Sequence, residues 1–132
     1  MRIGLALLLG SMVVLVAAYA ESTPSTALLV LSKGDHTLSI VDPSSLKVIA
    51  RAPSGPDPHE VVASTDGKLA FISNYGGGAY NTLTVIDLVK QTALPAVDLG
   101  PLRGPHGLVF TGGKVWFTAE AAKVRRARRC QR

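Results

Sequence analysis

Cysteine and aromatic residues are scarce in this chain of 132 residues. The single cysteine, Cys130, excludes a disulfide within the monomer and any metal site built on several thiolates. Aromatic side chains make up only 5% of the sequence, so there is no stacking platform of the kind that holds single-stranded nucleic acid. Beyond residue 20, no segment combines helical apolar spacing with a capping residue, which argues against helical fold classes.

Acidic residues are also few, but the net charge of +5 does not describe the whole chain. Residues 123–132 contain six of the 14 Lys and Arg residues and no acid. Residues 21–122 contain seven Lys or Arg against nine Asp or Glu, a net charge of −2. The body of the protein is therefore mildly acidic, and nucleic acid is not an expected partner.

The first 20 residues have the pattern of a signal peptide. Arg2 supplies a positive charge, residues 3–16 are uncharged, and Ala18-Tyr19-Ala20 places small residues where signal peptidase cleaves. An uncleaved membrane anchor is the alternative, although the apolar run is shorter than the roughly 20 residues that span a bilayer. We therefore expect cleavage after Ala20, no stable membrane span afterwards, and a periplasmic or secreted protein.

A repeat runs through the rest of the chain. The segment Phe71–Asn74, FISN, has counterparts in Leu29–Ser32, LVLS, and Trp116–Ala119, WFTA. FISN and WFTA begin 45 residues apart, and Asp42 and Asp87 are separated by the same interval. A period of about 40–50 residues built of short strands is typical of β-propeller blades.

Short apolar runs between Gly, Asp, Ser and Pro clusters predict an all-β chain of antiparallel blades of four strands. The expected strands are Leu28–Ser32, Thr37–Asp42, Lys47–Ala52, Glu60–Ser64, Leu69–Asn74, Thr82–Leu88, Ala93–Leu99, Gly107–Thr111 and Lys114–Thr118. They amount to about two and a quarter blades, whereas propellers close with about 4–8. Apolar blade faces would stay uncovered, so self-association through these faces is expected.

The blade pattern breaks at the basic end of the chain. Another strand ending in an aspartate is expected after residue 123, where the sequence instead reads RRARRCQR. We therefore predict that residues 123–132 are a basic tail of aberrant origin, either truncated or read in a shifted frame. A functional basic arm that binds nucleic acid or anionic lipid is the alternative.

The frame around the FISN segment resembles the YVTN-repeat family of extracytoplasmic β-propellers. FISN occupies the slot of the Tyr-Val-Thr-Asn motif, Pro58-His59 precedes the first strand of the blade, and Asp66-Gly67-Lys68 forms its turn. The resemblance covers residues 27–122. It implies a partial propeller that binds a ligand or a protein partner.

Two shorter motifs resemble propeller enzymes. Ser73–Tyr80, SNYGGGAY, is similar to a segment of lactonase-type propellers, which open sugar lactones. Gly104–Phe110 and Val115–Glu120 are similar to streptogramin lyase-like propellers, in which His and Glu side chains help to hold a metal and the substrate. Only His106 and Glu120 fall on that motif, and the lyase chemistry draws on blades outside this sequence.

Five residues are candidates for a binding site. His59 and His106 are 47 residues apart, and each follows a proline just before an innermost strand, which in a propeller is one mouth of the central channel. Imidazole there can bind a ligand or move a proton near pH 7; alternatively, Pro-His is a structural corner whose ring contacts a neighbouring blade. Asn74, Tyr75 and Glu120 join them through the motifs described above.

The sequence thus predicts an exported β-propeller repeat protein that binds an unknown ligand or protein partner and has no catalysis of its own. A remnant of a propeller enzyme of the lactonase or streptogramin lyase type is the alternative. No catalytic triad, paired carboxylates or zinc spacing is recognisable. We therefore predict no catalytic residues, no metal site and no cofactor.

Overall fold

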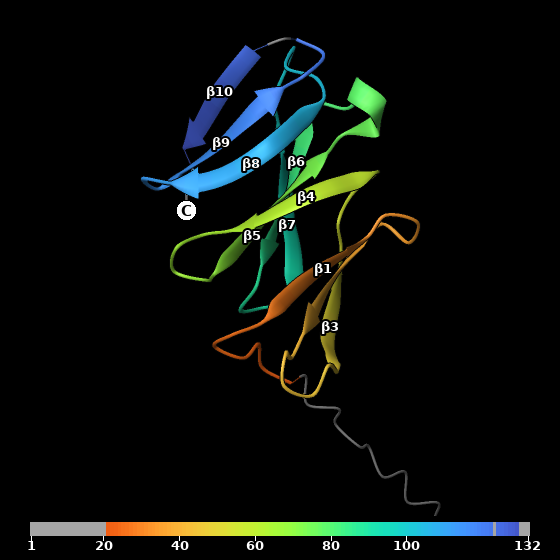
Figure 1. The fold of residues 1–132 in the computed structure, drawn as a ribbon, viewed down its shortest axis with the longest axis vertical. Helices are drawn as coiled ribbons and strands as arrows, with labels where there is room; N and C mark the ends of the chain where they lie inside the picture. The colour runs from red at the N-terminus through yellow and green to blue at the C-terminus, as the bar shows by residue number, and fades with distance from the viewer. Residues whose placement is uncertain (1–20, 123, 130–132) are drawn as a thin grey trace, which may run out of the picture.

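A computed structural model describes residues 21–122 and 124–129 of the chain. Within these ranges, ten strands form three antiparallel sheets (Figure 1), which confirms the predicted all-β fold. The predicted signal peptide, residues 1–20, lies outside the described residues, and so does Cys130. The described part contains no helix with the length and apolar character needed to cross a membrane.

The three sheets follow one another along the chain and along the long axis of the molecule in Figure 1. Sheet 1 contains β1 (Leu28–Ser32), β2 (Thr37–Val41) and β3 (Val48–Pro53). Sheet 2 contains β4 (Pro58–Ala63), β5 (Leu69–Asn74), β6 (Thr82–Asp87) and β7 (Thr92–Asp98). Sheet 3 contains β8 (Pro105–Thr111), β9 (Lys114–Ala119) and β10 (Val124–Arg129).

Both faces of sheet 2 are covered by its neighbours. Ile72 packs in a core shared with sheet 1, and Phe71 packs in a second core shared with sheet 3. Because successive side chains of a strand point to opposite faces, a strand covered on both sides needs consecutive apolar residues. The sequences LAFISN in β5 and TLTVID in β6 meet this need, and only the end residues of these strands are partly exposed.

The two cores have separate memberships. The first core has Leu38, Ile40, Ala52, Ala70, Ile72, Ile86 and Leu88 as its buried residues. The second core has Phe71, Leu83, Val85, Leu99, Val115, Phe117 and Ala119. Sheet 2 contributes to both, so it is the layer that holds the other two sheets together.

The predicted strands agree with the observed ones to within two residues at every end. The basic segment differs from the expectation, because β10 continues sheet 3 where the blade pattern was predicted to break. Val124 to Arg129 pair with β9 along their whole length. An edge strand needs only backbone partners on one side and commonly contains charged residues, so an Arg-rich segment can extend a sheet without an apolar pattern.

Candidate functional site

The candidate site lies where β4 and β8 begin, on neighbouring sheets. Each strand starts with a proline followed by a histidine, Pro58-His59 in β4 and Pro105-His106 in β8. Both prolines are among the fully buried residues, whereas His59 is exposed and His106 is about one-third exposed. The buried prolines anchor the strand ends, and the next residue of each strand turns toward the solvent.

Three rings contact one another at this edge of the sheets. The His59 ring lies 4.9 Å from the Tyr75 ring and 4.7 Å from the His106 ring, measured between centroids. Tyr75 and His106 are 5.5 Å apart in an edge-on arrangement. These distances are typical of favourable ring pairs, so the stack fixes both imidazoles relative to the phenol.

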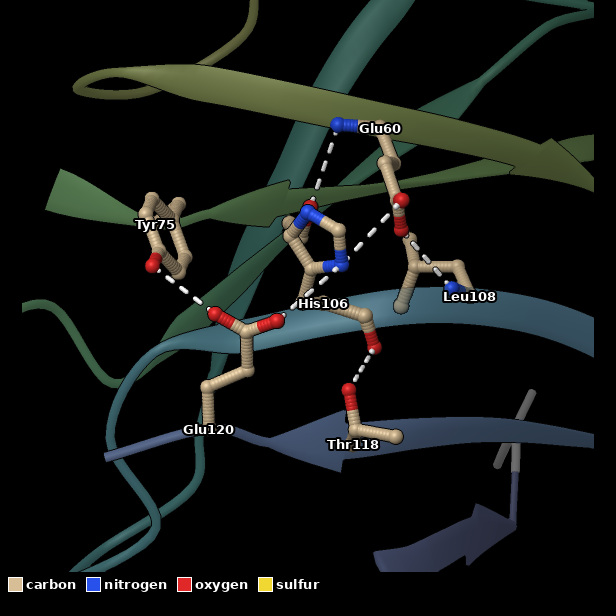
Figure 2. Close-up of polar contacts among 7 residues, drawn as sticks. Glu60, Tyr75, His106, Leu108, Thr118 and Glu120 are labelled. Carbon is tan, nitrogen blue, oxygen red and sulfur yellow. Dashed lines mark hydrogen bonds and ion pairs between the residues drawn. The ribbon is translucent and has the colours of Figure 1, made fainter. Parts of the chain in front are cut away.

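Two carboxylates face the His106 imidazole from different sheets (Figure 2). Its Nδ1 atom lies 3.5 Å from Glu60 Oε1 and 3.6 Å from Glu120 Oε1. The Tyr75 hydroxyl donates a hydrogen bond of 2.8 Å to Glu120 Oε2, and the Leu108 backbone N–H donates one of 2.8 Å to Glu60 Oε2. We call His59, Glu60, Tyr75, His106 and Glu120 the histidine–carboxylate cluster.

Backbone contacts hold the Glu120 side of the cluster. The Glu120 N–H donates to the Gly104 carbonyl at 3.0 Å, and the Gly104 N–H donates to the Tyr80 carbonyl at 2.8 Å. Gly104 has a φ of +64°, and a Cβ atom there would lie 3.0 Å from the Gly78 Cα. This close approach requires glycine, and it joins the loop after Tyr75 to the residue that bears the second carboxylate.

Asp57 holds the loop on the Tyr75 side. Its carboxylate accepts a hydrogen bond of 2.6 Å from the Gly76 N–H and forms an ion pair of 2.8 Å with Lys33, while its carbonyl accepts one of 3.2 Å from the Tyr75 N–H. The Lys33 ammonium, and then the Gly76 N–H, lower the pKa of Asp57 below its ordinary value. Asp57 also has a left-handed φ of 46°, a conformation that Asp tolerates better than most residues. The residue therefore links sheet 1 to the loop that positions Tyr75.

Hydrogen bonding also changes the acidity of the phenol. The Glu120 carboxylate accepts the Tyr75 proton in a hydrogen bond, and its negative charge opposes ionisation of the phenol. Both effects raise the pKa of Tyr75 above its ordinary value of 10.0. Tyr75 is thus held as a neutral hydrogen-bond donor that orients Glu120.

The cluster can accept hydrogen bonds and can move a proton through an imidazole, but it does not have the arrangement of a metal site. Within residues 21–122 and 124–129, no group of three or more His, Cys, Asp or Glu side chains could hold a metal ion. The metal that the lyase resemblance implies therefore does not fit the His106 and Glu120 positions of this chain. Carboxylates flanking an imidazole remain suited to orienting it.

Comparison with known proteins identifies the architecture. No protein-family model and no curated protein matches the chain. Among solved structures, it is similar to hydrazine synthase of Kuenenia stuttgartiensis, with a TM-score of 0.56 and 21% identity over 78% of this chain and 34% of that one. It is also similar to the dihydro-heme d1 dehydrogenase NirN in complex with DHE, with a TM-score of 0.55 and 21% identity. The chain has a β-propeller-like fold.

The similarity extends over part of a propeller protein. The chain spans 34% of the hydrazine synthase chain, and it spans 25% of the NirN chain while 81% of its own length is matched. In this propeller-like fold β4 and β8 hold equivalent positions, each the first strand of its sheet along the chain. The histidine–carboxylate cluster is therefore assembled between two successive propeller-like sheets.

The structure brings four of the five predicted site residues together and separates the fifth. His59, Tyr75, His106 and Glu120 lie in the cluster, whereas Asn74 is 1% exposed. The Asn74 amide donates to the hydroxyls of two threonines of β6, at 2.8 Å and 3.0 Å. Its side chain is fully engaged inside sheet 2, so we leave it out of the candidate site.

Two members of the site area were missed in the sequence. Glu60 faces His106 from β4, and Asp57, which lies just before β4, holds the loop that positions Tyr75. A signal for Glu60 was available, because it is the one charged residue in the otherwise apolar strand PHEVVA and directly follows His59. Asp57 stands in a loop of Pro and Gly where an aspartate is ordinary, and nothing in the sequence marks its partner as Lys33.

Proposed function

We propose that the histidine–carboxylate cluster binds a small ligand rich in hydrogen-bond donors, such as an amine or a polyhydroxylated ring. The chain would act as a binding module of propeller-like architecture. One observation carries the proposal: Glu60 and Glu120 come from neighbouring sheets and direct their carboxylates at the same imidazole, beside a partly exposed ring stack.

The chemistry of the cluster favours a ligand that donates hydrogen bonds. Ionised carboxylates are acceptors only, and each Oε2 atom has one protein donor, which leaves further lone pairs on both groups. The side chains of Glu60 and Glu120 are 32% and 46% exposed, so a ligand can reach them. The faces of Tyr75 and His59 offer a surface on which a cation or a sugar ring can pack.

Ligand binding can be tested through the histidines themselves. We expect ethylamine or glucose, added separately, to shift the imidazole NMR signals of His59 and His106. The signal of His36 should not move, because that residue lies at an exposed turn outside the cluster. Replacing Glu120 by Gln should weaken the binding by about tenfold, the effect of losing one charge-assisted hydrogen bond.

A matched control uses the third histidine. His36 has a left-handed φ of 52°, which asparagine tolerates, so His36→Asn should keep the fold and leave the affinity unchanged. The proposal fails if neither ligand class moves the His59 and His106 signals. It also fails if His36→Asn weakens binding as much as Glu120→Gln does.

Acid–base catalysis is a second candidate, favoured by the geometry around His106. A general base is usually oriented by a third group, and here Glu60 and Glu120 both lie within 3.6 Å of Nδ1. In this role, His106 would take a proton through its other ring nitrogen while the carboxylates orient the ring. Turnover of a sugar lactone without added metal, abolished in His106→Ala, would favour this candidate, and no turnover would exclude it for that substrate.

The proposal includes export from the cytoplasm. Support comes from Arg2, the uncharged stretch 3–16 and the small residues before Glu21. Mass spectrometry of the periplasmic or secreted fraction should find Glu21 at the N-terminus. Recovery of the chain with Met1 intact in the membrane fraction would contradict it.

A further inference from the structure

The outer faces of sheets 1 and 3 expose apolar side chains whose counterparts in sheet 2 pack in or against its two cores. On sheet 1, Leu28 and Val30 are 45% and 47% exposed. On sheet 3, Val109 and Trp116 are 52% and 45% exposed. We call the first pair the leading face and the second pair the trailing face.

The repeat shows what these residues would contact if they were covered. Val30 corresponds to Ile72, which is 0% exposed and packs against the preceding sheet. Trp116 corresponds to Phe71, which is 3% exposed and packs against the following sheet. The leading face therefore has the pattern of a surface that meets a preceding sheet, and the trailing face that of a surface that meets a following one.

The correspondence extends to the neighbouring positions. Leu28 stands in the place of Ala70, which is 0% exposed in the first core. Val109 stands in the place of Val62, which packs against the second core. The two faces thus match the two sides of the junctions already formed inside the chain.

We propose that the leading face of one copy of the chain docks head to tail on the trailing face of a second copy. The faces belong to sheets at opposite ends of the long axis in Figure 1, so one copy does not cover its own. The contact would repeat the junctions that sheet 2 makes with sheets 1 and 3 inside the chain. It is heterologous, because different faces of the two copies meet.

The experiment measures the mass of the exported, purified chain by light scattering over a range of concentrations, in reducing buffer so that Cys130 cannot cross-link copies. A mass above that of one copy, rising with concentration, is expected. Val30→Glu and Trp116→Glu should each weaken association by about 30-fold or more, as for a central interface residue. Val89→Glu is the matched control, because Val89 is 67% exposed outside both faces and should leave the association intact.

Mixing the two variants separates head-to-tail docking from docking of like faces. A pair formed by Val30→Glu and Trp116→Glu chains retains one junction with both natural faces, so the mixture should dimerise better than either variant alone. Since each substituted residue is about half-exposed in the single copy, unchanged circular dichroism of the monomeric variants is expected and excludes misfolding as the cause.

The single tryptophan gives a second readout at the proposed junction. Emission of Trp116 should shift to shorter wavelength as the natural chain and Val89→Glu associate, and should not shift for Val30→Glu. A chain that is monomeric at every concentration would overturn the docking and point to sheets of another protein as the cover. A Val30→Glu chain that associates as the natural chain does would overturn the head-to-tail docking.

Discussion

The two Pro-His corners occupy the same place in the repeat and do different things. Pro58 pairs with Asn74 and Pro105 pairs with Ala119, and each strand shifts register near its start, after Pro58 in β4 and after His106 in β8. Both prolines are fully buried. The residue after the histidine, however, is Glu60 in the first corner and a glycine in the second.

This difference determines which corner supplies a carboxylate to the contact between sheets 2 and 3. Gly107 has a left-handed φ of +59°, and a Cβ atom there would lie 3.4 Å from Thr118 Oγ1. Glu60 does not have a positive φ, and its side chain extends to β8, where it accepts the Leu108 N–H and faces His106. The repeat therefore gives the two corners equivalent prolines and histidines. Glu60, which is a glycine in the second corner, makes the contact between the sheets.

The largest effect is expected from exchanging the residues that pair with the two prolines. Ala119→Asn places an amide at a position that is 0% exposed in the second core, and it should lower the free energy of unfolding by about 3 kcal/mol through overpacking and burial of polar atoms. The reciprocal Asn74→Ala removes the amide that binds the Thr82 and Thr84 hydroxyls. It should cost about 2 kcal/mol.

Denaturant unfolding curves measure both changes, with the slope checked for a constant value. The doubly exchanged chain is the useful comparison, since the two positions lie on different sheets and their costs should add. If Ala119→Asn proved neutral, the second corner would accept the polar network of the first. The contrast between the corners would then concern Glu60 alone.

A smaller effect is expected when the first corner is made to resemble the second. Glu60→Gly removes the acceptor of the Leu108 N–H and the carboxylate that faces His106, and it should cost about 1–2 kcal/mol in unfolding free energy. Glu60→Gln is the matched control, because its amide oxygen can still accept the Leu108 N–H. Equal losses in the two variants would show that the charge, rather than the hydrogen bond, joins the sheets.

The smallest effect concerns the titration of Tyr75. Because the hydrogen bond to Glu120 and its charge raise the pKa of Tyr75 above 10.0, the stability that the contact provides is present below that pH. It is lost as the pH rises through the higher pKa of the folded state. The absorbance of tyrosinate, compared between the natural chain and Tyr75→Phe, should place the Tyr75 transition above that of an ordinary tyrosine.

A control on the partner sharpens this titration. Glu120→Gln keeps an acceptor for the phenol but removes the negative charge, so the pKa of Tyr75 should fall toward its ordinary value. An unchanged transition in Glu120→Gln would contradict the role given to the carboxylate. It would also argue against an electrostatic link between the two corners. Tyr75 stacks on His59 at the first corner, and Glu120 faces His106 at the second.

The sequence was sufficient to predict nine of the ten described strands and insufficient to predict the contacts between sheets. Strand ends follow from Gly, Asp and Pro at the turns and from apolar runs between them, and these are local signals. The equivalence of His59 and His106 also follows from the repeat. The meeting of Glu60 with His106 depends on how sheets 2 and 3 pack, and the ion pair of Lys33 with Asp57 joins residues of sheets 1 and 2, so neither has a local signal.

The basic segment and Asn74 show two ways in which a sequence pattern leaves the structure open. β10 has no apolar alternation that would mark it as a strand, and it is defined by backbone pairing with β9. Asn74 lies in a motif that resembles a functional one, yet its amide satisfies buried hydroxyls within the sheet. In both cases the sequence identified the segment along the chain. It did not predict that the Asn74 side chain points into sheet 2, or that β10 would pair with the edge of β9.

Because sheet 2 contributes to both cores, the order in which the two cores can form follows from their positions along the chain. The residues of the first core extend from Ala27 to Leu88, and those of the second from Val62 to Ala122. During synthesis, which starts at the N-terminus, the chain can form the first core before all residues of the second core have been made. Domains and repeats fold as their segments become available. Sheet 2 would then serve as the template on which sheet 3 forms, and the histidine–carboxylate cluster, which needs both sheets, would be the last part of the described structure to form.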